Sequence, residues 1–546
     1  MSAEPALMSL TAVAQAIAQK RLSSREATQS CLRRIARCEP RLNAFIAIEA
    51  DEALKAADAA DAALARADSR GALHGVPLAH KDMYYEAGRV ATCGSRIRRD
   101  FVASTTSTAL QRLKDAGTIR LGTLQMAEFA YGPTGHNAHF GAVHNPWRFD
   151  HITGGSSSGS GAAVAARLTF AALGSDTGGS VRMPAHFCGV TGLKTTVGRI
   201  SRAGAMPLSQ SLDTVGPLAR TAGDCALLLG LMAGADPEDP TAVEGPLPDY
   251  LAAVQRPVKG LTIGIPAAFY VDDLDPEVAR IIDETVAILK REGAAVVQVE
   301  LPDQRQLAAA SQLVLAVEAA AFHKRWMIER PQDYGPQVLM RLQNGLAVPA
   351  VSYLEAMRWR GPALAAHLAA VNGVDAVIAP VAPLAAPTIA ESDVGNSPDA
   401  DAVIQRLTRF TRPVNYLGLP SLAVPAVSYL EAMRWRGPAL AAHLAAVDGV
   451  DAVIAPVAPV AAPTIAESDV GNSPDADAVI QRLTRFTRPV NYLGLPSLAI
   501  PAGFTRDGLP VGMQLIGRPF DEATLLRIGA AFQRATDFHD RVPELA

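Results

Sequence analysis

The sequence predicts an α/β fold with a large mixed β-sheet, and three observations support that class. Helix-like and strand-like segments alternate along the N-terminal half of the chain, which is the pattern of a sheet covered by helices. Aromatic residues make up 5% of the 546 residues, so the apolar volume must come from Ala, Leu and Val. Hydrophobic residues at 49% and charged residues at 19% are typical of an ordinary globular protein.

The individual elements follow from hydrophobic periodicity and flanking residues. Helical spacing of apolar residues predicts helices over 8–21, 24–37, 51–68, 106–116 and 275–292. Ser24 is the expected N-cap of the second of these helices. Short apolar runs predict strands over 75–82, 119–124, 168–176, 261–266 and 295–301. A further helix is expected to open at about 180–187, and the segment 500–517 is typical of a β-hairpin.

Charge and cysteine content exclude several classes of protein. The net charge is −4 and no basic tract is present, so we expect no direct contact with nucleic acid. The N-terminus lacks the features of a signal peptide and the apolar run 225–235 is too short to span a bilayer, so we expect a cytoplasmic protein without a membrane anchor. The five cysteines are scattered without CxxC spacing, which favours buried thiols over disulfides or a zinc site.

A tandem repeat is the strongest organisational feature. Residues 346–421 recur at 422–497, and the two copies differ only at Asn372/Asp448 and Leu384/Val460. LAVPA begins each copy and LAIPA follows the second, so misaligned recombination between such strings explains the duplication. An assembly artefact in the sequence is the alternative, and the two substitutions favour real divergence.

A packed core has room for one such set of elements. We expect a single domain over 1–546, with the other set looped out, docked on the surface or swapped into a neighbouring chain as a homodimer. Our hypothesis is a hybrid, in which helix 351–371 and strand 375–380 come from the first copy and the LGLPSLA strand from the second. The extruded part then begins near 386–402, and protease is expected to cut between about 385 and 480.

Two glycine-rich serine loops carry the chemistry. They are GGSSSGSGAA at 154–163 and GSDTGGSVR at 174–182, the second directly after a predicted strand. Backbone N–H groups converge in such a loop and suit a developing oxyanion, while glycine permits close approach. A flexible linker is the plain alternative, but a linker rarely leads into an apolar helix. A G-x-S-x-G elbow centred on Ser157 is rejected, because the polar stretch 145–153 precedes it instead of a strand.

These loops resemble the amidase signature family when taken with GVPLAHKD, which contains Lys81, 75 residues before the Ser156 of GGSSSGS. Ser180, in DTGGSVR, follows Ser156 by 24 residues, which is the layout of that family. The flanks 127–147, 189–201 and 508–526 are also similar, so the resemblance covers the chain except for one repeat copy. It implies a twisted mixed sheet with helices on both faces.

The resemblance also implies the roles of the site residues. Ser180 is the expected nucleophile, Ser156 stands on a cis peptide and bridges to it, and Lys81 is the base. A lysine base must be neutral, and burial lowers a lysine pKa. The expected oxyanion hole consists of the backbone N–H groups of Thr177, Gly178, Gly179 and Ser180.

Other residues are expected to support this triad. Asp176 and Arg182 brace the loop, and Ser157 forms a hydrogen bond within its own loop. Tyr131 and Gly132 are candidates for the acyl side of the substrate, while His80 and Cys188 are assigned to the scaffold. No cofactor and no metal are expected.

The expected function is hydrolysis of a small-molecule carboxamide through an acyl-enzyme. The alternatives are the glutaminase component of a tRNA-dependent amidotransferase, which would need a partner protein, and an inactive duplicated paralogue.

Overall fold

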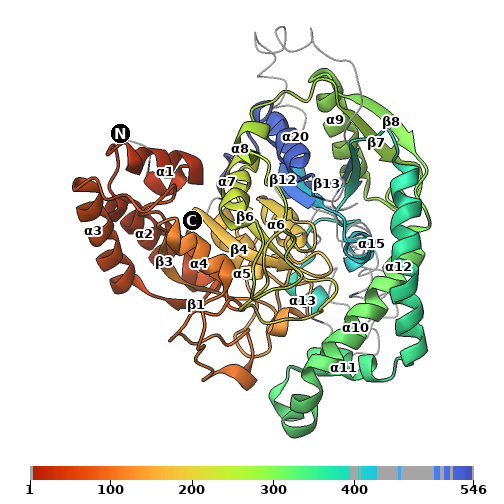
Figure 1. Ribbon diagram of the computed structural model, residues 1–546, viewed down its shortest axis with the longest axis horizontal. Coiled ribbons are helices and arrows are strands. Elements are labelled where there is room, and N and C mark those ends of the chain that lie inside the picture. The colour runs from red at the N-terminus through yellow and green to blue at the C-terminus, as the bar shows by residue number, and fades with distance from the viewer. Residues whose placement is uncertain are drawn as a thin grey trace.

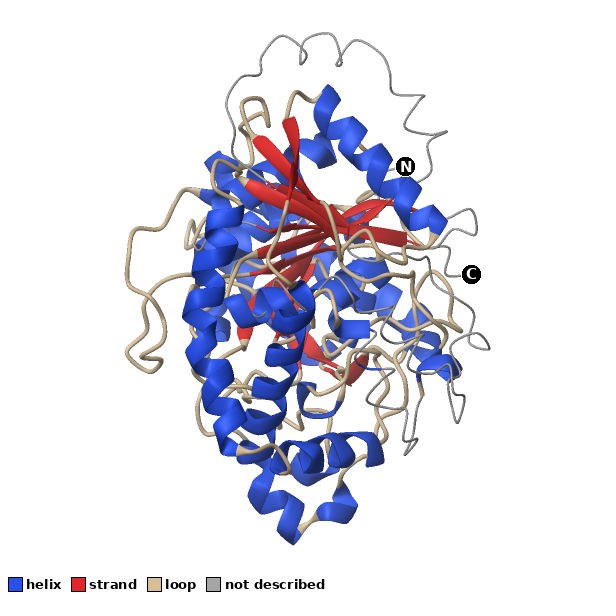
Figure 2. Cartoon of the chain, turned by 90° about the vertical axis from the view of Figure 1, so that its right-hand side faces the viewer, coloured by secondary structure: helices blue, strands red, loops and turns tan. Residues whose placement is uncertain are grey.

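One mixed β-sheet crosses the molecule, and helices lie on both sides of it (Figure 2). The computed structural model describes residues 4–393, 404, 407–426, 453–456, 497–504, 510–516 and 520–543. Within them the strand order is β1-β3-β2-β4-β6-β5-β10-β12-β13-β11-β9-β7-β8. The strands are β1 Phe45–Ile48, β2 Pro77–Lys81, β3 Ile119–Leu124, β4 Ala171–Asp176, β5 Thr191–Lys194, β6 Thr214–Ala219, β7 Thr262–Pro266, β8 Ala295–Val299, β9 Ala376–Pro380, β10 Ser421–Ala426, β11 Val453–Pro456, β12 Ser497–Phe504 and β13 Pro510–Ile516.

The helices cover this sheet, and segments far apart in the chain lie side by side, such as α20 next to α7 and α8 (Figure 1). Those before the second glycine loop are α1 Leu10–Ala18, α2 Ser24–Leu42, α3 Ala50–Ala65, α4 Thr108–Asp115 and α5 Ser158–Ala165. Those after it are α6 Arg182–Cys188, α7 Ala222–Met232, α8 Tyr250–Ala253, α9 Pro276–Arg291, α10 Gln304–Glu329, α11 Pro336–Leu346, α12 Ala350–Ala370, α13 Ile389–Ser392, α15 Arg412–Leu417 and α20 Glu522–Arg534. Short 3-10 turns are η1 Pro5–Leu7, η2 Arg96–Arg98, η3 Glu128–Ala130 and η4 Pro331–Asp333.

The predicted α/β class is confirmed, and the mixed strand directions show how the sheet is built. β2 runs parallel to β3 and β4, whereas β4 and β6 are antiparallel. β12 and β13 form the predicted C-terminal hairpin. All residues of β2 and β4 are buried, as expected for strands that are covered on both faces. The two strands therefore place their C-terminal residues, Lys81 and Asp176, inside the protein.

The start of α2 corrects one prediction. Ser23, not Ser24, is the N-cap: its hydroxyl accepts from the Glu26 N–H, and the Glu26 carboxylate accepts from the Ser23 N–H. This reciprocal capping box needs a spacing of three residues between serine and glutamate. Ser24 instead donates its hydroxyl to the Gly75 carbonyl at 2.6 Å.

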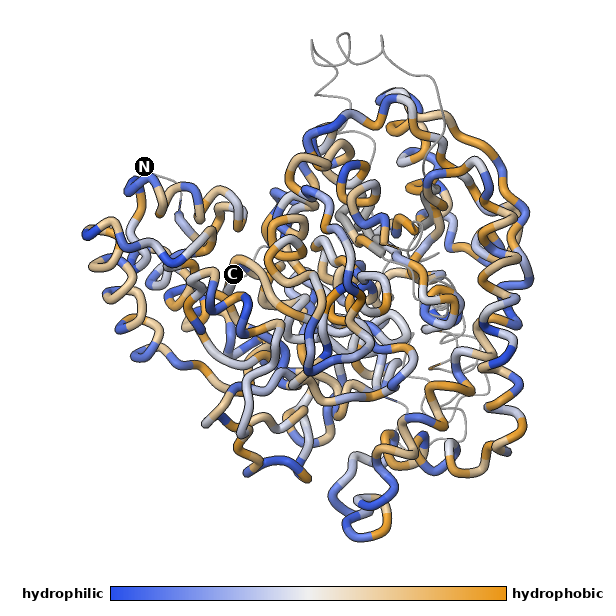
Figure 3. Tube along the Cα trace, viewed as in Figure 1, coloured by the Kyte–Doolittle hydropathy of each residue, from blue (hydrophilic) through white to orange (hydrophobic). Residues whose placement is uncertain are grey.

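The outer helices mix hydrophilic and hydrophobic residues along their length (Figure 3). In α9, Val278, Ile281, Ile282 and Leu289 are buried at helical spacing, whereas Lys290 near its end is exposed. No helix in the described ranges is both long enough and apolar enough to span a membrane. All five cysteines are buried and free, as predicted.

The duplicated strands share positions in the sheet. Ser421 of β10 and Ser497 of β12 both lie opposite Lys194 of β5, in the same antiparallel register. β9 and β11 share a register on β13 in the same way. A strand edge offers one set of N–H and C=O groups, so each position holds one strand at a time. The two copies therefore present equivalent strands to β5 and to β13, and that one copy replaces the other at each place stays a prediction.

The first copy supplies the helices described at these places. They are α12, α13 and α15, and α15 packs against α10 and α12. Residues 394–403, in the segment where we expected the first copy to leave the core, lie outside the described residues, as do 427–452 and 457–496. Extrusion of the unused set therefore stays a prediction.

Deleting residues 422–497 is expected to leave a 470-residue chain that folds and hydrolyses amides like the full chain. Each sheet position needs one strand, and the entropy of closing a long loop changes slowly with its length. We expect the same circular dichroism spectrum, an equal or higher thermal midpoint and loss of protease cutting between about 385 and 480. An aggregated or inactive shortened chain would show that both copies are needed.

Candidate active site

Lys81 lies at the end of β2 with its amine fully enclosed. The side chain is 1% exposed. Its Nζ lies 2.7 Å from Ser156 Oγ, 2.8 Å from Ser175 Oγ and 3.1 Å from Ser157 Oγ. An ammonium donates to all three hydroxyls, whereas a neutral amine donates to two and accepts from the third. The site thus accommodates both protonation states of the lysine.

Burial lowers the pKa of Lys81 to about 7, because the charged form loses its hydration. The carboxylates of Asp213 and Asp176 oppose this effect only in part. Lys81 is therefore balanced between amine and ammonium near neutral pH. A group balanced in this way can both take and return a proton.

The first glycine loop carries Ser156 after a cis peptide bond between Gly155 and Ser156. A Cβ at Gly155 would lie 2.5 Å from the Gly132 carbonyl oxygen, so only glycine fits there. Ser157 was predicted to form a hydrogen bond within its own loop, but its described hydroxyl contacts lie outside that loop: it is 3.1 Å from Lys81 Nζ and accepts from the Ser175 N–H at 3.2 Å. It therefore ties the first loop to the end of β4.

The second loop carries Ser180 between β4 and α6, and Asp176 organises it. The Asp176 carboxylate accepts from the N–H groups of Gly179 at 2.8 Å and Val181 at 3.2 Å. Gly179 has a φ of +123°, and a Cβ there would lie 2.7 Å from the Thr411 side chain. Both conditions require glycine at this position.

This arrangement changes the expected oxyanion hole. The Gly179 N–H donates to the Asp176 carboxylate, so it is not available as the oxyanion donor that we predicted. In the described part of the chain, the N–H groups of Gly178 and Ser180 form no hydrogen bond, and Thr177, Gly178 and Ser180 line the same small cavity. The candidate donors are therefore reduced to these three residues.

Asp176 and Arg182 form the buried pair that we expected to brace the loop. Both are 0% exposed, with Arg182 Nε 3.0 Å from Asp176 Oδ2 and Nη2 3.0 Å from Oδ1. Asn415 of α15 completes the group: its amide donates to Asp176 at 3.0 Å and its oxygen accepts from Arg182 at 2.7 Å. This network fastens α15 to the Ser180 loop.

A cavity of about 20 Å³ opens at Ser180. Tyr131 and Gly132, our candidates for the acyl side, lie in its wall together with Thr177 and Gly178. Ser180 lines this cavity and is 9% exposed. Lys81 and Ser156 do not line the cavity and are both buried.

The structure brings Lys81 and Ser156 into contact, but no hydrogen bond joins Ser156 to Ser180 among the described residues. Their loops are adjacent, since the Ser157 N–H donates to the Ser180 carbonyl at 3.3 Å. Catalytic hydrogen bonds of this kind are often long and tighten when substrate binds. The placement of Ser180 is thus compatible with the predicted role of nucleophile, although the hydrogen bond from Ser180 to Ser156 that a proton relay needs is not formed among the described residues.

Several residues of the site were not predicted. Ser175 contacts Lys81, and its place directly before Asp176 in the second loop was the available signal. Arg341, Thr408 and Arg412 line the cavity at Ser180, but they lie far along the chain in segments without a motif. His80 and Cys188 are buried, as expected of scaffold residues.

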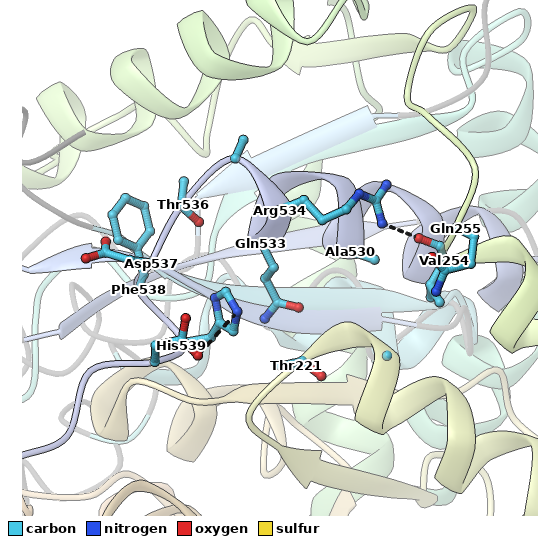
Figure 4. A pocket seen from close by; sticks show the side chains of 13 residues that line it. Thr221, Val254, Gln255, Ala530, Gln533, Arg534, Thr536, Asp537, Phe538 and His539 are labelled. Carbon is cyan, nitrogen blue, oxygen red and sulfur yellow. Dashed lines mark hydrogen bonds and ion pairs between the residues drawn. The ribbon is translucent and has the colours of Figure 1, made fainter. Parts of the chain in front are cut away.

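A second cavity, of about 460 Å³, lies elsewhere, between α20, α8 and the start of α7 (Figure 4). Two of its polar side chains are engaged in the scaffold: Arg534 donates to the Val254 carbonyl at 2.5 Å and Gln533 to Thr191 Oγ1 at 2.9 Å. None of the predicted site residues lines it. Within the described residues, no group of three His, Cys, Asp or Glu side chains could hold a metal ion.

A buried lysine–serine contact next to a serine-bearing glycine loop, in an α/β fold, is typical of one class of protein, the hydrolytic enzymes that use a serine nucleophile. The chain belongs to the amidase family: the sequence profile of that family, described as Amidase, matches residues 26–433 and again 426–526. The second match falls on the second repeat copy and the C-terminal hairpin. Membership of this family makes amide C–N hydrolysis the general chemistry of the chain.

Relatives and solved structures agree with this family. A glutamyl-tRNA(Gln) amidotransferase subunit from Halorhodospira halophila is 38% identical over 542 residues, which cover 96% of each chain. A structure solved in work on a vestigial protein complex and the origins of an s-triazine catabolic enzyme is 31% identical, with a TM-score of 0.77, covering 96% of this chain and 98% of that one. The peptide amidase of Stenotrophomonas maltophilia is 28% identical, with a TM-score of 0.70 and 96% coverage of both chains.

Proposed function

We propose that the protein hydrolyses a carboxamide through an acyl-enzyme on Ser180, with Ser156 and Lys81 as the proton relay. The observation that carries this proposal is the buried 2.7 Å contact between Lys81 Nζ and Ser156 Oγ, next to the Ser157 N–H that donates to the Ser180 carbonyl. A serine hydroxyl is a weak nucleophile unless a base removes its proton. The buried amine is the one base that reaches Ser156 by a hydrogen bond in the described structure.

In the acylation step, Ser180 gives its proton to Ser156 while Ser156 gives its own proton to Lys81. The Ser180 oxygen attacks the amide carbon and forms a tetrahedral oxyanion, which the N–H groups of Thr177, Gly178 and Ser180 stabilise. Collapse of this intermediate breaks the C–N bond. Ser156 protonates the leaving nitrogen and recovers a proton from Lys81.

In the second half of the cycle, water replaces the released amine or ammonia. Water gives a proton to Ser156 as its oxygen attacks the ester carbon of the acyl-enzyme, and Lys81 again receives the proton of Ser156. The ester bond to Ser180 then breaks, and the proton returns through Ser156 to the Ser180 oxygen. The free acid leaves and all three side chains are restored.

The value of kcat/KM is expected to rise with pH through about 7 and to level off above it. Lys81 acts as the base in its neutral form, and lowering the pKa to about 7 makes that form predominant only above this pH. Below it, the rate should fall about tenfold per pH unit, because each unit reduces the amine fraction tenfold.

The pH profile is measured with a neutral amide, so that the substrate itself does not titrate. Lys81→Arg is the matched variant, since a guanidinium keeps the positive charge but does not release its proton at these pH values. A profile that stays flat between pH 5 and 9 would contradict Lys81 as the base.

Two settings for this chemistry differ in the partner that they need. A stand-alone amidase acts by itself on a small carboxamide. The glutaminase component of an amidotransferase supplies ammonia from glutamine within a complex, and the 38% identity to an amidotransferase subunit over 96% of both chains favours this alternative. We therefore propose the amidotransferase role as the second candidate, with one or more protein partners.

The two settings are distinguished by purifying the full chain from its own cells under mild conditions. A stoichiometric partner, with glutaminase activity that appears only in its presence, supports the amidotransferase role. Full amidase activity of the isolated chain, as monomer or homodimer, supports the stand-alone enzyme. Loss of all activity in both preparations supports the inactive paralogue.

A further inference from the structure

We propose that Asp213 is a positioning residue of this site, whose carboxylate holds Thr177 of the nucleophile loop in place and stabilises the ammonium that forms on Lys81. This inference rests on the proposed function and adds a group that acts on the reaction through its neighbours. It is carried by three hydrogen bonds to the buried carboxylate, and by a cavity that Asp213 shares with Ser175, a contact of Lys81.

The pairing of β4 with β6 brings Asp213 to the nucleophile loop. Asp176, the last residue of β4, lies opposite Thr214, the first residue of β6, in the antiparallel register. One residue further, the same register places Asp213 opposite Thr177, although the two stand 36 residues apart in the chain. Residues that lie opposite each other in neighbouring strands share a side of the sheet, so these two side chains can meet.

Three donors fix the Asp213 carboxylate. Its Oδ1 accepts from the Thr177 hydroxyl at 2.6 Å, and its Oδ2 accepts from the N–H groups of Leu208 at 2.8 Å and Ser209 at 3.1 Å. Thr177 and Leu208 both line the cavity at Ser180, and Thr177 is one of the candidate oxyanion donors. A single carboxylate therefore joins two separate parts of the wall around the nucleophile.

A further cavity, of about 230 Å³, connects Asp213 with a partner of Lys81. Asp213, Tyr84 and Ser175 line it, and Ser175 Oγ lies 2.8 Å from Lys81 Nζ. Burial lowers the pKa of Lys81, and the largest opposing contribution comes from the Asp213 carboxylate. A negative charge near an amine stabilises its protonated form. Asp213 therefore helps Lys81 to hold the proton that it receives in the acylation step.

The other groups that bear on Lys81 are paired or uncharged. Asp176, the next carboxylate that raises the pKa of Lys81, forms a buried ion pair with Arg182. Burial raises the pKa of the nearby Cys93 thiol, so this thiol stays uncharged at neutral pH. Asp213 is thus the nearby carboxylate whose charge is not already balanced by a buried arginine pair.

The surroundings of Asp213 favour its charged form. Burial raises its pKa, whereas the hydrogen bonds from Thr177 and Leu208 and the charge of Arg202 lower it. Arg202 itself lies 3.8 Å from Asp239 at the same cavity. All three hydrogen bonds to Asp213 come from donors, and a carboxylate that accepts from several donors is stabilised as the anion.

Asp213→Asn removes the charge and keeps the shape. The amide oxygen can accept from the two backbone N–H groups, and the amide nitrogen can donate to the Thr177 hydroxyl. Without the carboxylate, the ammonium form of Lys81 is less stable and Lys81 becomes a weaker base. We expect the midpoint of kcat/KM against pH to move from about 7 to lower pH, by about one pH unit, and the plateau above it to fall about tenfold.

The midpoint is measured in two independent ways on the full chain. One is the pH profile of kcat/KM with a neutral amide. The other is an NMR titration of protein labelled with ¹³C at lysine Cε, in which the Lys81 resonance is the one missing from Lys81→Arg. Glu238→Gln is the matched control, because Glu238 lines the same cavity as Asp213 but is exposed. Solvent screens such a charge, so both midpoints should stay within about 0.2 pH units of the wild type.

Thr177→Val tests the hydrogen bond separately, and it still decides the positioning role if Asp213→Asn does not fold. Valine has the shape of threonine without the hydroxyl, and the charge of Asp213 stays in place. We expect the plateau of kcat/KM to fall about tenfold, because a hydrogen bond to a charged group is lost, and the midpoint to stay near 7. An unchanged plateau would overturn the positioning of Thr177 by Asp213.

The outcomes separate this inference from the proposed function. If hydrolysis depends on Ser180 but Asp213→Asn lowers only the plateau and leaves both Lys81 midpoints unchanged, Asp213 is merely structural: the inference is overturned and the hydrolase stands. If no amide is hydrolysed yet the NMR midpoint of Lys81 falls in Asp213→Asn, the link between Asp213 and Lys81 stands and the proposed function is wrong. A midpoint that moves equally in Glu238→Gln would also overturn the inference, because the effect would then not be specific to Asp213.

Discussion

Replacing Ser180 by alanine is expected to reduce amide hydrolysis by about 10⁴- to 10⁶-fold. Removal of a nucleophile eliminates the acyl-enzyme route and leaves only the contribution of binding and of the oxyanion donors. Stability should change little, because Ser180 lies at the cavity and its hydroxyl supports no described hydrogen bond. The measurement is single-turnover hydrolysis of a primary amide, with the folded state checked by circular dichroism.

Ser158→Ala is the matched control for Ser180→Ala. Ser158 is a buried serine of the first glycine loop, and its hydroxyl has no hydrogen-bond partner among the described residues. Its removal is expected to leave turnover within about threefold of the wild type. Comparable loss in both variants would mean that any serine in these loops perturbs the site. Full activity of Ser180→Ala would refute the mechanism.

Replacing Arg182 by glutamine is expected to lower the free energy of unfolding by about 3–5 kcal/mol, because it leaves the buried Asp176 carboxylate without its charged partner. The same change should loosen the Ser180 loop, since Asp176 also holds the Gly179 N–H, and Asn415 contacts both members of the pair. Urea unfolding measures the stability, and amide hydrolysis measures the loop.

The pair is tested by a double-mutant cycle. Asp176→Asn combined with Arg182→Gln removes both charges, so we expect the combined loss of stability to be smaller than the sum of the single losses. Arg325→Gln removes a partner of the exposed Arg325–Glu329 pair and serves as the control with little expected effect. Additive losses would show that Asp176 and Arg182 act independently.

The secondary structure and the catalytic candidates were accessible from sequence because their signals are local. The runs at 119–124 and 261–266 became β3 and β7, and 180–187 became α6 with a shift of two residues. The α2 cap was misplaced by one residue, since Ser23 and Ser24 both fit the cap preference and only the contact with Glu26 separates them.

The wall of the cavity was not accessible in this way. Arg341 and Arg412 stand more than 150 residues after Ser180, in helical segments with no glycine-rich or charged motif. Their relation to Ser180 depends on how α11 and α15 pack against the nucleophile loop. A periodic pattern reports which side of a helix is buried and does not report what that side meets.

The α/β class, the duplication and the candidates Lys81, Ser156 and Ser180 could all be read from the chain, because each is written in contiguous patterns or in near-exact repetition. The tertiary structure was needed to show that Asp176 accepts from the Gly179 N–H, that two arginines line the cavity at Ser180, and that equivalent strands of both repeat copies share a register opposite β5. The physical reason is that these contacts join residues whose distance in the chain says nothing about their distance in space. Which side chain lines a cavity, and which strand pairs with a sheet edge, depends on how the separate segments pack together.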